Sequence, residues 1–432
     1  MPPKRRVDTT ERAVVTPPSA GGDRLVRIVA YAYSATPGGG SEHAVGWTWS
    51  RLLAGLGEVW LLTKPFDGDR DGICARIDSA PERARLHVVE IAPPAWLYRL
   101  PRRWRGGLFS RLEYVAWQFE ALRAARHLHA THEFDLAWHL TWANAWMGST
   151  VSCLGIPFVF GPVGGGVEPP WRLAGSLGAH GILSELQRTA IRNLARHFNP
   201  LAHITWRRAR LVLVQNHETG RWLPRRIHPK VVQFPNAILE SIPPPRHEAA
   251  PGRNVALFAG RLLPLKGVAL AILAIGRLPE WRLIICGDGV DEPRLRRLAD
   301  RLDVAERIEF RGMQPRDEVM RVMAEEADVL LFPSLHDEGS LAVAEAVAIG
   351  LPVVCLDVGG PPILGGIGVR TDTFDRTVER LAEAVRESSS STPSAHPPFD
   401  LESRRADIAD LMTRFGLSPV RAARGVGAHE KA

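Results

Sequence analysis

The feature that most constrains the fold is an alternation of short apolar runs with longer amphipathic stretches along most of the chain. Short apolar runs bounded by turn-forming residues are typical of buried strands, and the amphipathic stretches between them are typical of helices that cover a sheet. The pattern therefore predicts parallel sheets with helices on their faces. The predicted strands are residues 25–33, 57–63, 86–91, 135–140, 157–161 and 210–215, followed by 254–260, 281–287, 307–312, 327–333 and 351–357.

Two segments interrupt this alternation. Residues 240–254 contain three consecutive prolines, and residues 387–398 are rich in serine and proline, so neither suits a helix or a strand. A chain of 432 residues can bury two cores. We predict an α/β fold of two Rossmann-like, doubly wound domains that face a central cleft. The predicted division is a disordered tail (1–24), an amino-terminal Rossmann-like domain (25–245), a carboxyl-terminal Rossmann-like domain (250–385), and a low-complexity linker with a terminal helix (386–432).

Composition argues against several classes of protein. Four cysteines without C-x-x-C spacing predict neither a disulfide framework nor a zinc site. No apolar run approaches the roughly 20 residues that span a bilayer. The net charge of +7 suits a phosphorylated substrate, an anionic membrane surface or nucleic acid, but no nucleic-acid-binding motif is present. We therefore expect a cytoplasmic protein without a nucleic-acid partner.

Glycine-rich loops follow two predicted strands of the first half. Gly38, Gly39 and Gly40 allow close backbone approach to a ligand, and Ser41 can cap the helix behind them, where an anion would be favoured. A turn without a ligand is the alternative. A G-x-G-x-x-G dinucleotide motif is not met, because His43 stands at its last position.

Further along the first half, a second glycine run and a histidine follow predicted strands. The glycines at 164–166 also allow close backbone approach to a ligand, although a tight turn that binds no ligand would have the same sequence pattern. His139 lies at the end of a predicted strand, where it is either a core residue or a group facing the cleft.

In the second half, charged residues follow two predicted strands. Arg261 and Lys266 lie five positions apart in a loop with glycines and a proline, which suits a diphosphate. Gly339 and Ser340 precede a strong helix former, so free N–H groups there would face a phosphate. Asp337 lies before this helix and Glu345 inside it. Two carboxylates with this spacing could bind hydroxyl groups on either side of a phosphate. The alternative is that Asp337 caps the helix and Glu345 is an exposed side chain without a ligand.

These motifs together resemble those of the family-4 retaining glycosyltransferases, which have the GT-B fold. The stretch "GRLLPLKG" resembles the R-x4-K diphosphate motif of that family, and "DEGSLAVAEAVAIGLPVV" its E-x7-E motif, with aspartate in place of the first glutamate. The stretches "GGGSE", "HLTWANAW", "PFVFGPVGGG" and "FPNAI" extend the resemblance over residues 25–365.

The resemblance implies a role for each matching residue. Arg261 and Lys266 would hold the donor diphosphate, Glu345 the ribose and Asp337 the transferred sugar, and His139 would contact that sugar near the reacting carbon. The other implied donor-binding residues are Gly39, Gly40, Ser41, Met313, Gly339, Ser340 and Leu341, and the implied acceptor-side residues are Glu42, Gly164, Gly165 and Gly166.

The implied activity is metal-independent, retaining transfer of a sugar in glycan or polysaccharide synthesis. The donor would be a UDP- or GDP-linked sugar, bound as a substrate with no cofactor, and the acceptor a saccharide or a lipid-linked molecule. Two other functions stay open: a catalytically silent subunit that binds nucleotide or saccharide, and a sugar-nucleotide epimerase.

Membrane contact is a separate expectation. Residues 96–126 interleave seven arginines with aromatic residues, including Trp96, Trp104, Phe109 and Trp117, a composition that suits anionic headgroups. The protein would then lie at the inner face of the cell membrane. A helix pair of an ordinary acceptor domain is the alternative.

Overall fold

The computed structural model describes residues 24–40, 42–99, 107–142, 144–241, 253–388 and 399–417. The predicted disordered tail lies almost wholly outside these residues. So do the predicted boundary near residue 245, most of both interrupting segments, and Ser41.

The first sheet is parallel and has the strand order β3-β2-β1-β4-β5-β6-β7. Its strands are rich in Val, Leu and Phe and are covered on both faces by apolar side chains, as a sheet between two helical layers requires. The order reverses between β1 and β4. The strands are β1 Arg27–Tyr31, β2 Glu58–Thr63, β3 Leu86–Glu90, β4 Leu136–His139, β5 Phe158–Val163, β6 Leu211–Val214 and β7 Val231–Gln233.

The second sheet is also parallel, with the order β10-β9-β8-β11-β12-β13. One apolar core contains its strands and the helices on them, and the order reverses between β8 and β11. The strands are β8 Val255–Ala259, β9 Arg282–Cys286, β10 Ile308–Gly312, β11 Val329–Phe332, β12 Val353–Leu356 and β13 Ile367–Val369.

All eleven predicted strands are present, with ends that differ by at most two residues. The sequence analysis missed β7 and β13, because each has only three residues and so shows no apolar run. The helices are α1 Glu42–Leu56, α2 Arg70–Asp78, α3 Gly107–His132, α4 Gly178–Phe198, α5 Pro200–Arg208, α6 His217–Trp222, α7 Val268–Gly276, α8 Glu292–Arg301, α9 Arg316–Arg321, α10 Leu341–Ala348, α11 Phe374–Ser388 and α12 Leu401–Arg414.

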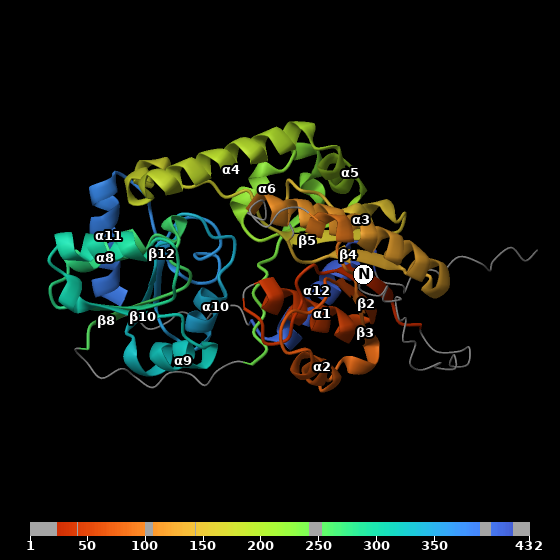
Figure 1. The fold of residues 1–432 in the computed structure, drawn as a ribbon, viewed down its shortest axis with the longest axis horizontal. Coiled ribbons are helices and arrows are strands. Elements are labelled where there is room, and N and C mark those ends of the chain that lie inside the picture. The colour runs from red at the N-terminus through yellow and green to blue at the C-terminus, as the bar shows by residue number, and fades with distance from the viewer. Residues whose placement is uncertain are drawn as a thin grey trace, which may run out of the picture.

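The two sheets form two lobes, and α4 runs across the top between them (Figure 1). The fold is the predicted pair of doubly wound domains. In such sheets ligands bind beyond the carboxyl ends of the strands, where the strand order reverses. The loops after β1, β4, β8 and β11 are therefore the ones that could form a site.

The segment before α4 packs on the second domain although it belongs to the first half of the chain. Leu173 and Leu177 are buried in the core of the second sheet, and Ile182 packs against that core. The close approach of Gly181 to Pro264 joins α4 to the loop after β8. The division between the domains in space is therefore not the same as the division along the chain.

The terminal helix α12 returns to the first domain. Ile408, Leu411 and Met412 are buried in the core that covers one face of the first sheet. Arg405 forms an ion pair with Glu82, and a backbone hydrogen bond joins Leu239 to Phe399 just before the helix. The chain thus crosses between the domains a second time.

The segment predicted to contact a membrane is largely a packed part of the first domain. Phe109 and Trp117 are buried, Trp96 is about half exposed, and Trp104 lies outside the described residues. The expectation that Phe109 and Trp117 face lipid is therefore wrong. Within the described ranges, no helix is both long and apolar enough to span a membrane.

Replacing Ile408 with alanine tests the packing of α12. The side chain is fully buried, so Ile408→Ala should lower the free energy of unfolding of the first domain by about 2–5 kcal/mol, through lost burial and a cavity. Urea unfolding measures this change. Asp410→Ala, an exposed change on the same helix, is the control, and equal losses in the two variants would contradict the packing described.

Candidate functional site

A cavity of about 540 Å³ lies between the domains, where the four loops at the two strand-order reversals meet. Its wall is formed by side chains and backbone from both halves of the chain. The first domain contributes Glu42, Val45, Leu140, Trp142, Asn144, Pro162, Gly164, Arg188, Gln215 and Asn236, and the second Ala259, Gly260, Arg261, Leu263, Leu265, Lys266, Phe332, His336, Asp337, Glu338, Gly339, Ser340, Leu341 and Ala342.

The loop after β8 brings two cations to this cavity, as the sequence predicted. Arg261 and Lys266 both line it. Gly267 ends this loop with a φ of 73°, and a Cβ there would lie 1.9 Å from the carbonyl oxygen of Pro333. Only glycine therefore lets the β8 loop pack against the end of β11, which places Lys266 beside the β11 loop.

Asp337, in the loop after β11, pairs with Lys266. Its carboxylate accepts a hydrogen bond from Lys266 Nζ at 2.5 Å, in an ion pair largely shielded from solvent. Gly359, with a φ of 71°, packs against the Asp337 carbonyl, where a Cβ would lie 2.1 Å from the oxygen. The Gly360 N–H donates to that oxygen at 3.0 Å. The Gly359–Gly360 pair thus fixes the Asp337 backbone.

The amino end of α10 opens on the same cavity. Ser340 caps the helix, with its Oγ accepting from the Val343 N–H at 3.4 Å. Gly339, Ser340 and Leu341 line the cavity, and their contact with a donor stays a prediction. A helix amino terminus favours an anion, and here it lies in the same cavity as Arg261 and Lys266.

Glu345 does not line this cavity. It is buried on α10 and accepts a hydrogen bond from Arg316 Nε at 2.6 Å. Burial raises the pKa of Glu345, and the Arg316 charge opposes that rise. The alternative of a capping acid with an exposed glutamate is wrong, because Ser340 is the cap and Glu345 is buried.

Glu42, at the start of α1, reaches the cavity from the first domain. Its Oε2 accepts the Trp142 N–H at 3.2 Å. The surrounding protein raises the pKa of Glu42, while the Trp142 N–H and the positive charge of Arg261 oppose that rise. Glu42 therefore brings a carboxyl group from the first domain to the cavity that Arg261 also lines.

The structure does not bring His139 to the cavity. It is the last residue of β4, as predicted, but its ring is buried, with Tyr114 Oη 2.8 Å from Nε2 and Ser149 Oγ 2.6 Å from Nδ1. Burial lowers the pKa of His139 to about 3. The expectation that its ring faces the cleft is wrong for this structure, because both ring nitrogens have protein partners inside the first domain.

Three other predicted donor-binding residues also lie away from the main cavity. Gly39 lines a separate cavity of about 240 Å³ beside β1 and β2, and neither Gly40 nor Met313 lines the main one. Met313 is largely exposed after β10. Their contact with a donor stays a prediction.

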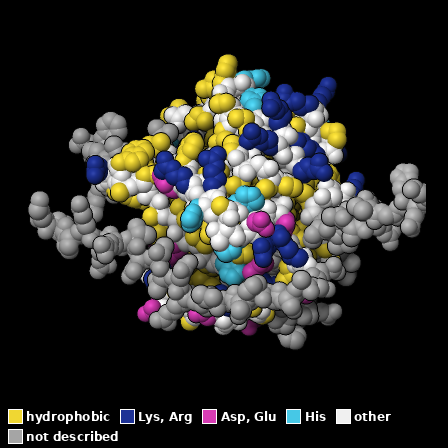
Figure 2. All heavy atoms as spheres, turned by 90° about the vertical axis from the view of Figure 1, so that its right-hand side faces the viewer, with side chains coloured by type: hydrophobic (Ala, Val, Ile, Leu, Met, Phe, Trp, Pro, Cys, Tyr) yellow, Lys and Arg dark blue, Asp and Glu magenta, His cyan; other side chains and the backbone are white. Residues whose placement is uncertain are grey.

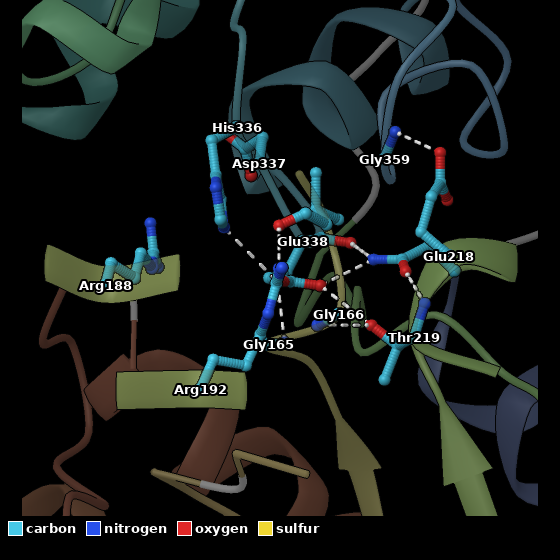
Figure 3. Close-up of polar contacts among 12 residues, drawn as sticks. Gly165, Gly166, Arg188, Arg192, Glu218, Thr219, His336, Asp337, Glu338 and Gly359 are labelled. Atoms are coloured by element: carbon cyan, nitrogen blue, oxygen red, sulfur yellow. Dashed lines mark hydrogen bonds and ion pairs between the residues drawn. The ribbon is translucent and has the colours of Figure 1, made fainter. Parts of the chain in front are cut away.

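Glu338 also lines the cavity, and the sequence analysis did not predict it there. Its carboxylate accepts hydrogen bonds from Gly165 N and Asn216 Nδ2, both at 2.6 Å, and lies 3.3 Å from Thr219 Oγ1 (Figure 3). All three partners belong to the first domain. The only sequence signal was its place next to Asp337, because its partners are distant in the chain.

The glycines at 164–166 approach Glu338 closely. A Cβ on Gly164 would lie 2.7 Å from the Glu338 side chain, and the Gly166 N–H donates to Thr219 Oγ1 at 3.1 Å. The close backbone approach expected of this run is thus to Glu338 and α6. Gly164 alone of the three lines the cavity, and an acceptor role stays a prediction.

A buried histidine extends this contact to α4. His336 Nδ1 lies 3.5 Å from Glu185. Its Nε2 lies 3.4 Å from Glu338 (Figure 3). Burial alone would raise the pKa of Glu338, but His336, Asn216 and the Gly165 N–H together lower it to about 2. The pKa of Glu185 is lowered as well, by His336 and Arg188 against the effect of burial. A charged network therefore joins the domains beside the cavity.

No group of three or more His, Cys, Asp or Glu side chains that could hold a metal ion occurs in the part of the chain that the structure describes.

Comparison with known sequences matches the second domain. Residues 243–396 match the family model of the glycosyl transferases group 1. A D-inositol 3-phosphate glycosyltransferase of Mycobacterium marinum is 37% identical over 141 residues, which are 31% of this chain and 30% of that relative. The match thus spans less than a third of that relative's length.

Comparison with solved structures covers both domains. A sucrose-phosphate synthase from Thermosynechococcus elongatus is similar with a TM-score of 0.57 and 17% identity, over 90% of this chain and 99% of that one. Anabaena HepE, in complex with UDP and glucose, gives a TM-score of 0.50 and 16% identity over 90% and 100%. These likenesses support the fold, a GT-B pair of Rossmann-like domains, as expected.

The depressed pKa of Glu338 predicts an acid-sensitive stability. Because its pKa falls from 4.5 to about 2 on folding, the ionised carboxylate stabilises the fold above about pH 4.5, and this contribution is lost as the pH falls towards 2. Glu338→Gln should therefore lower the free energy of unfolding at pH 7 by about 2–4 kcal/mol and weaken its dependence on pH in that range.

Denaturant unfolding at several pH values measures both effects. Glu306→Gln, at an exposed position of the second domain, is the matched control and should behave as the unchanged protein. A Glu338→Gln variant whose stability falls with acid as steeply as that of the unchanged protein would show that Glu338 is not the group responsible.

Proposed function

We propose that this protein is a metal-independent, retaining glycosyltransferase that moves a sugar from a nucleoside-diphosphate donor to a saccharide or lipid-linked acceptor. The observation that carries this proposal is the meeting of four post-strand loops around one cavity, with Arg261, Lys266 and the start of α10 on one side. The family match of the second domain and the likeness to glycosyltransferase folds support it. HepE, which has a similar fold, is in complex with UDP and glucose.

In this proposal the diphosphate lies between the two cations and the amino end of α10. Arg261 offers a planar fork of N–H donors and Lys266 a compact charge, so together they neutralise a leaving diphosphate without a divalent ion. The N–H groups at the start of α10 add partial positive charge. Asp337 accepts hydrogen bonds from the sugar hydroxyls.

The ribose would bind beside Glu345. Its Oε1 already accepts a hydrogen bond from the half-exposed Arg316, so the ribose hydroxyls would have to share this carboxylate or displace that arginine.

Retention would follow from attack on the face that the leaving group vacates. The acceptor hydroxyl approaches from the side of the diphosphate, and a phosphate oxygen of the donor takes its proton as the C–O bond to the diphosphate breaks. The protein then has to orient the two substrates and stabilise charge. The acceptor would enter from the first-domain wall, where Glu42 and Gly164 lie.

One observation favours the epimerase alternative. That reaction needs a carboxyl group that can protonate a departing diphosphate, and Glu42 has a raised pKa and faces the cavity. Release of free monosaccharide from the donor when no acceptor is present would support this alternative.

A screen of UDP-, GDP- and ADP-sugars tests the function. A bound donor should raise the unfolding temperature, because a ligand at 100 times its dissociation constant adds about 2.7 kcal/mol. The product formed with a positive donor should keep the anomeric configuration of the donor by NMR, and the rate should be unchanged by EDTA. Donor binding without transfer to any saccharide or lipid-linked acceptor would favour a silent subunit.

Arg261→Ala should strongly reduce both transfer and the stabilisation by nucleoside diphosphate. The side chain is exposed at the cavity wall, so the fold should be unaffected. Loss of one charge-assisted bond should weaken diphosphate binding by about 1.5–3 kcal/mol in calorimetric titration. Arg282→Ala, an exposed change at the amino end of β9, is the control. Unchanged turnover in Arg261→Ala would contradict the assignment.

Asp337→Asn should separate binding from transfer. The substitution removes a carboxylate that pairs with Lys266 and repels a phosphate, so affinity for the nucleoside diphosphate should rise by about 1 kcal/mol. Transfer should fall, because the sugar loses a charged acceptor. Calorimetry with the nucleoside diphosphate alone and initial rates with the donor measure the two effects. Weaker diphosphate binding would show that Asp337 does not oppose the phosphate.

A further inference from the structure

Helix α4 has an apolar face that is exposed to solvent. Large apolar side chains on this face are 40–75% exposed, and they recur mainly at spacings of three and four residues, which places them along one side of the helix. This spacing is usual on a helix face that packs against a core, but here the apolar face points away from the protein. The stripe consists of Leu183, Leu186, Ala190, Ile191, Leu194 and Phe198.

Positive charge is concentrated in the same part of the chain. Residues 171–230 contain eleven Lys and Arg against two Glu, a net charge of +9, whereas the whole chain carries +7. One of the two acids, Glu185, is buried. Figure 2 shows Lys and Arg side chains among hydrophobic ones towards the top of the molecule, the side on which α4 and α5 lie in Figure 1. The exposed arginines of this segment are Arg172, Arg207, Arg208, Arg210, Arg221, Arg225 and Arg226.

We propose that α4 docks this protein on an anionic lipid bilayer, with the stripe inserted among the headgroups and the exposed arginines of residues 171–230 attracted to their negative charge. An exposed apolar face within a strongly basic segment matches the two attractions of such a surface, burial of apolar area and attraction to negative charge. A second copy of this chain would be repelled by the same +9 charge, so charge complementarity favours the bilayer.

The opposite face of α4 points into the protein. Glu185 contacts His336 there, and Arg188 lines the cavity between the domains. A bilayer against the stripe would therefore lie about one helix diameter, roughly 10 Å, from the cavity wall. This position would suit a lipid-linked acceptor, but the docking itself does not depend on the proposed reaction.

Co-sedimentation with vesicles tests the proposal on the full chain. The vesicles contain phosphatidylcholine alone or equal parts phosphatidylcholine and phosphatidylglycerol. We expect binding to the anionic vesicles, weaker binding at high salt, and little binding to the neutral ones. The variant Leu186→Gln/Leu194→Gln should bind at least about tenfold more weakly, because it removes apolar area from the contact.

The matched control is Leu112→Gln/Phe119→Gln, which changes two exposed apolar residues of α3. It should bind anionic vesicles as the unchanged protein does. Circular dichroism and the unfolding temperature should be the same for all three proteins, since the changed side chains are exposed. Equal vesicle binding by both double variants, or loss confined to the α3 variant, would overturn the proposal.

Light scattering without vesicles tests the remaining alternative, in which a second copy of this chain covers the stripe. A monomer in both the unchanged protein and the α4 variant agrees with lipid docking. If the unchanged protein is a dimer that the α4 variant dissociates, and the two bind vesicles equally, the stripe is an interface between copies of this chain and the proposal is wrong. No binding of the unchanged protein to anionic vesicles at low salt would overturn it as well.

Discussion

The arrangement of the two domains depends most on the hydrogen bonds that the first domain donates to the Glu338 carboxylate. A half-buried carboxylate loses much of its hydration, and here His336, the Asn216 amide, the Gly165 N–H and Thr219 replace it. The bonds from Asn216, Gly165 and Thr219 reach it across the domain boundary. Glu218 adds a second link by accepting the Gly359 N–H at 3.1 Å. The partners would lose their hydrogen bonds if the domains separated, so the closed arrangement is stabilised electrostatically.

The loop of Asp337, Glu338 and Gly339 takes part both in the contact between the domains and in the cavity. Glu338 stands between Asp337 and Gly339, which both line the cavity. Gly359 and Gly360 pack against the backbone of this loop, so its position is set by the second domain while its carboxylate is held by the first. A change in how the domains meet would therefore break the hydrogen bonds of Glu338, which is the neighbour of Asp337 in this loop. The ion pair between Asp337 and Lys266 balances charge in the cavity before any ligand enters.

Helix α4 combines three surfaces in one element. Its start packs on the second domain, its inner face meets His336 and the cavity, and its outer face is apolar and exposed. The terminal helix α12 makes the complementary crossing, from the second domain back to the core of the first. Each domain is thus stabilised by a segment that the chain order assigns to the other half.

Much of the fold and part of the site were determined by the sequence itself. The apolar runs predicted eleven strands, because burial between helical layers imposes local composition, and the post-strand loops predicted Arg261, Lys266, Asp337 and the start of α10 at one cavity. In parallel sheets the carboxyl ends of the strands lie on one edge, so chain order alone brings such loops together.

Only the tertiary structure decided which polar residues face the cavity and which are enclosed. His139 follows a predicted strand and Glu345 fits the predicted spacing from Asp337, yet His139 is buried between Tyr114 and Ser149 and Glu345 is paired with Arg316. Glu338 showed no local pattern, because its partners at 165, 216 and 219 are more than a hundred residues away. Whether a carboxylate is free for a ligand or joins two domains depends on how the domains pack. The spacing of residues along the chain does not predict that packing.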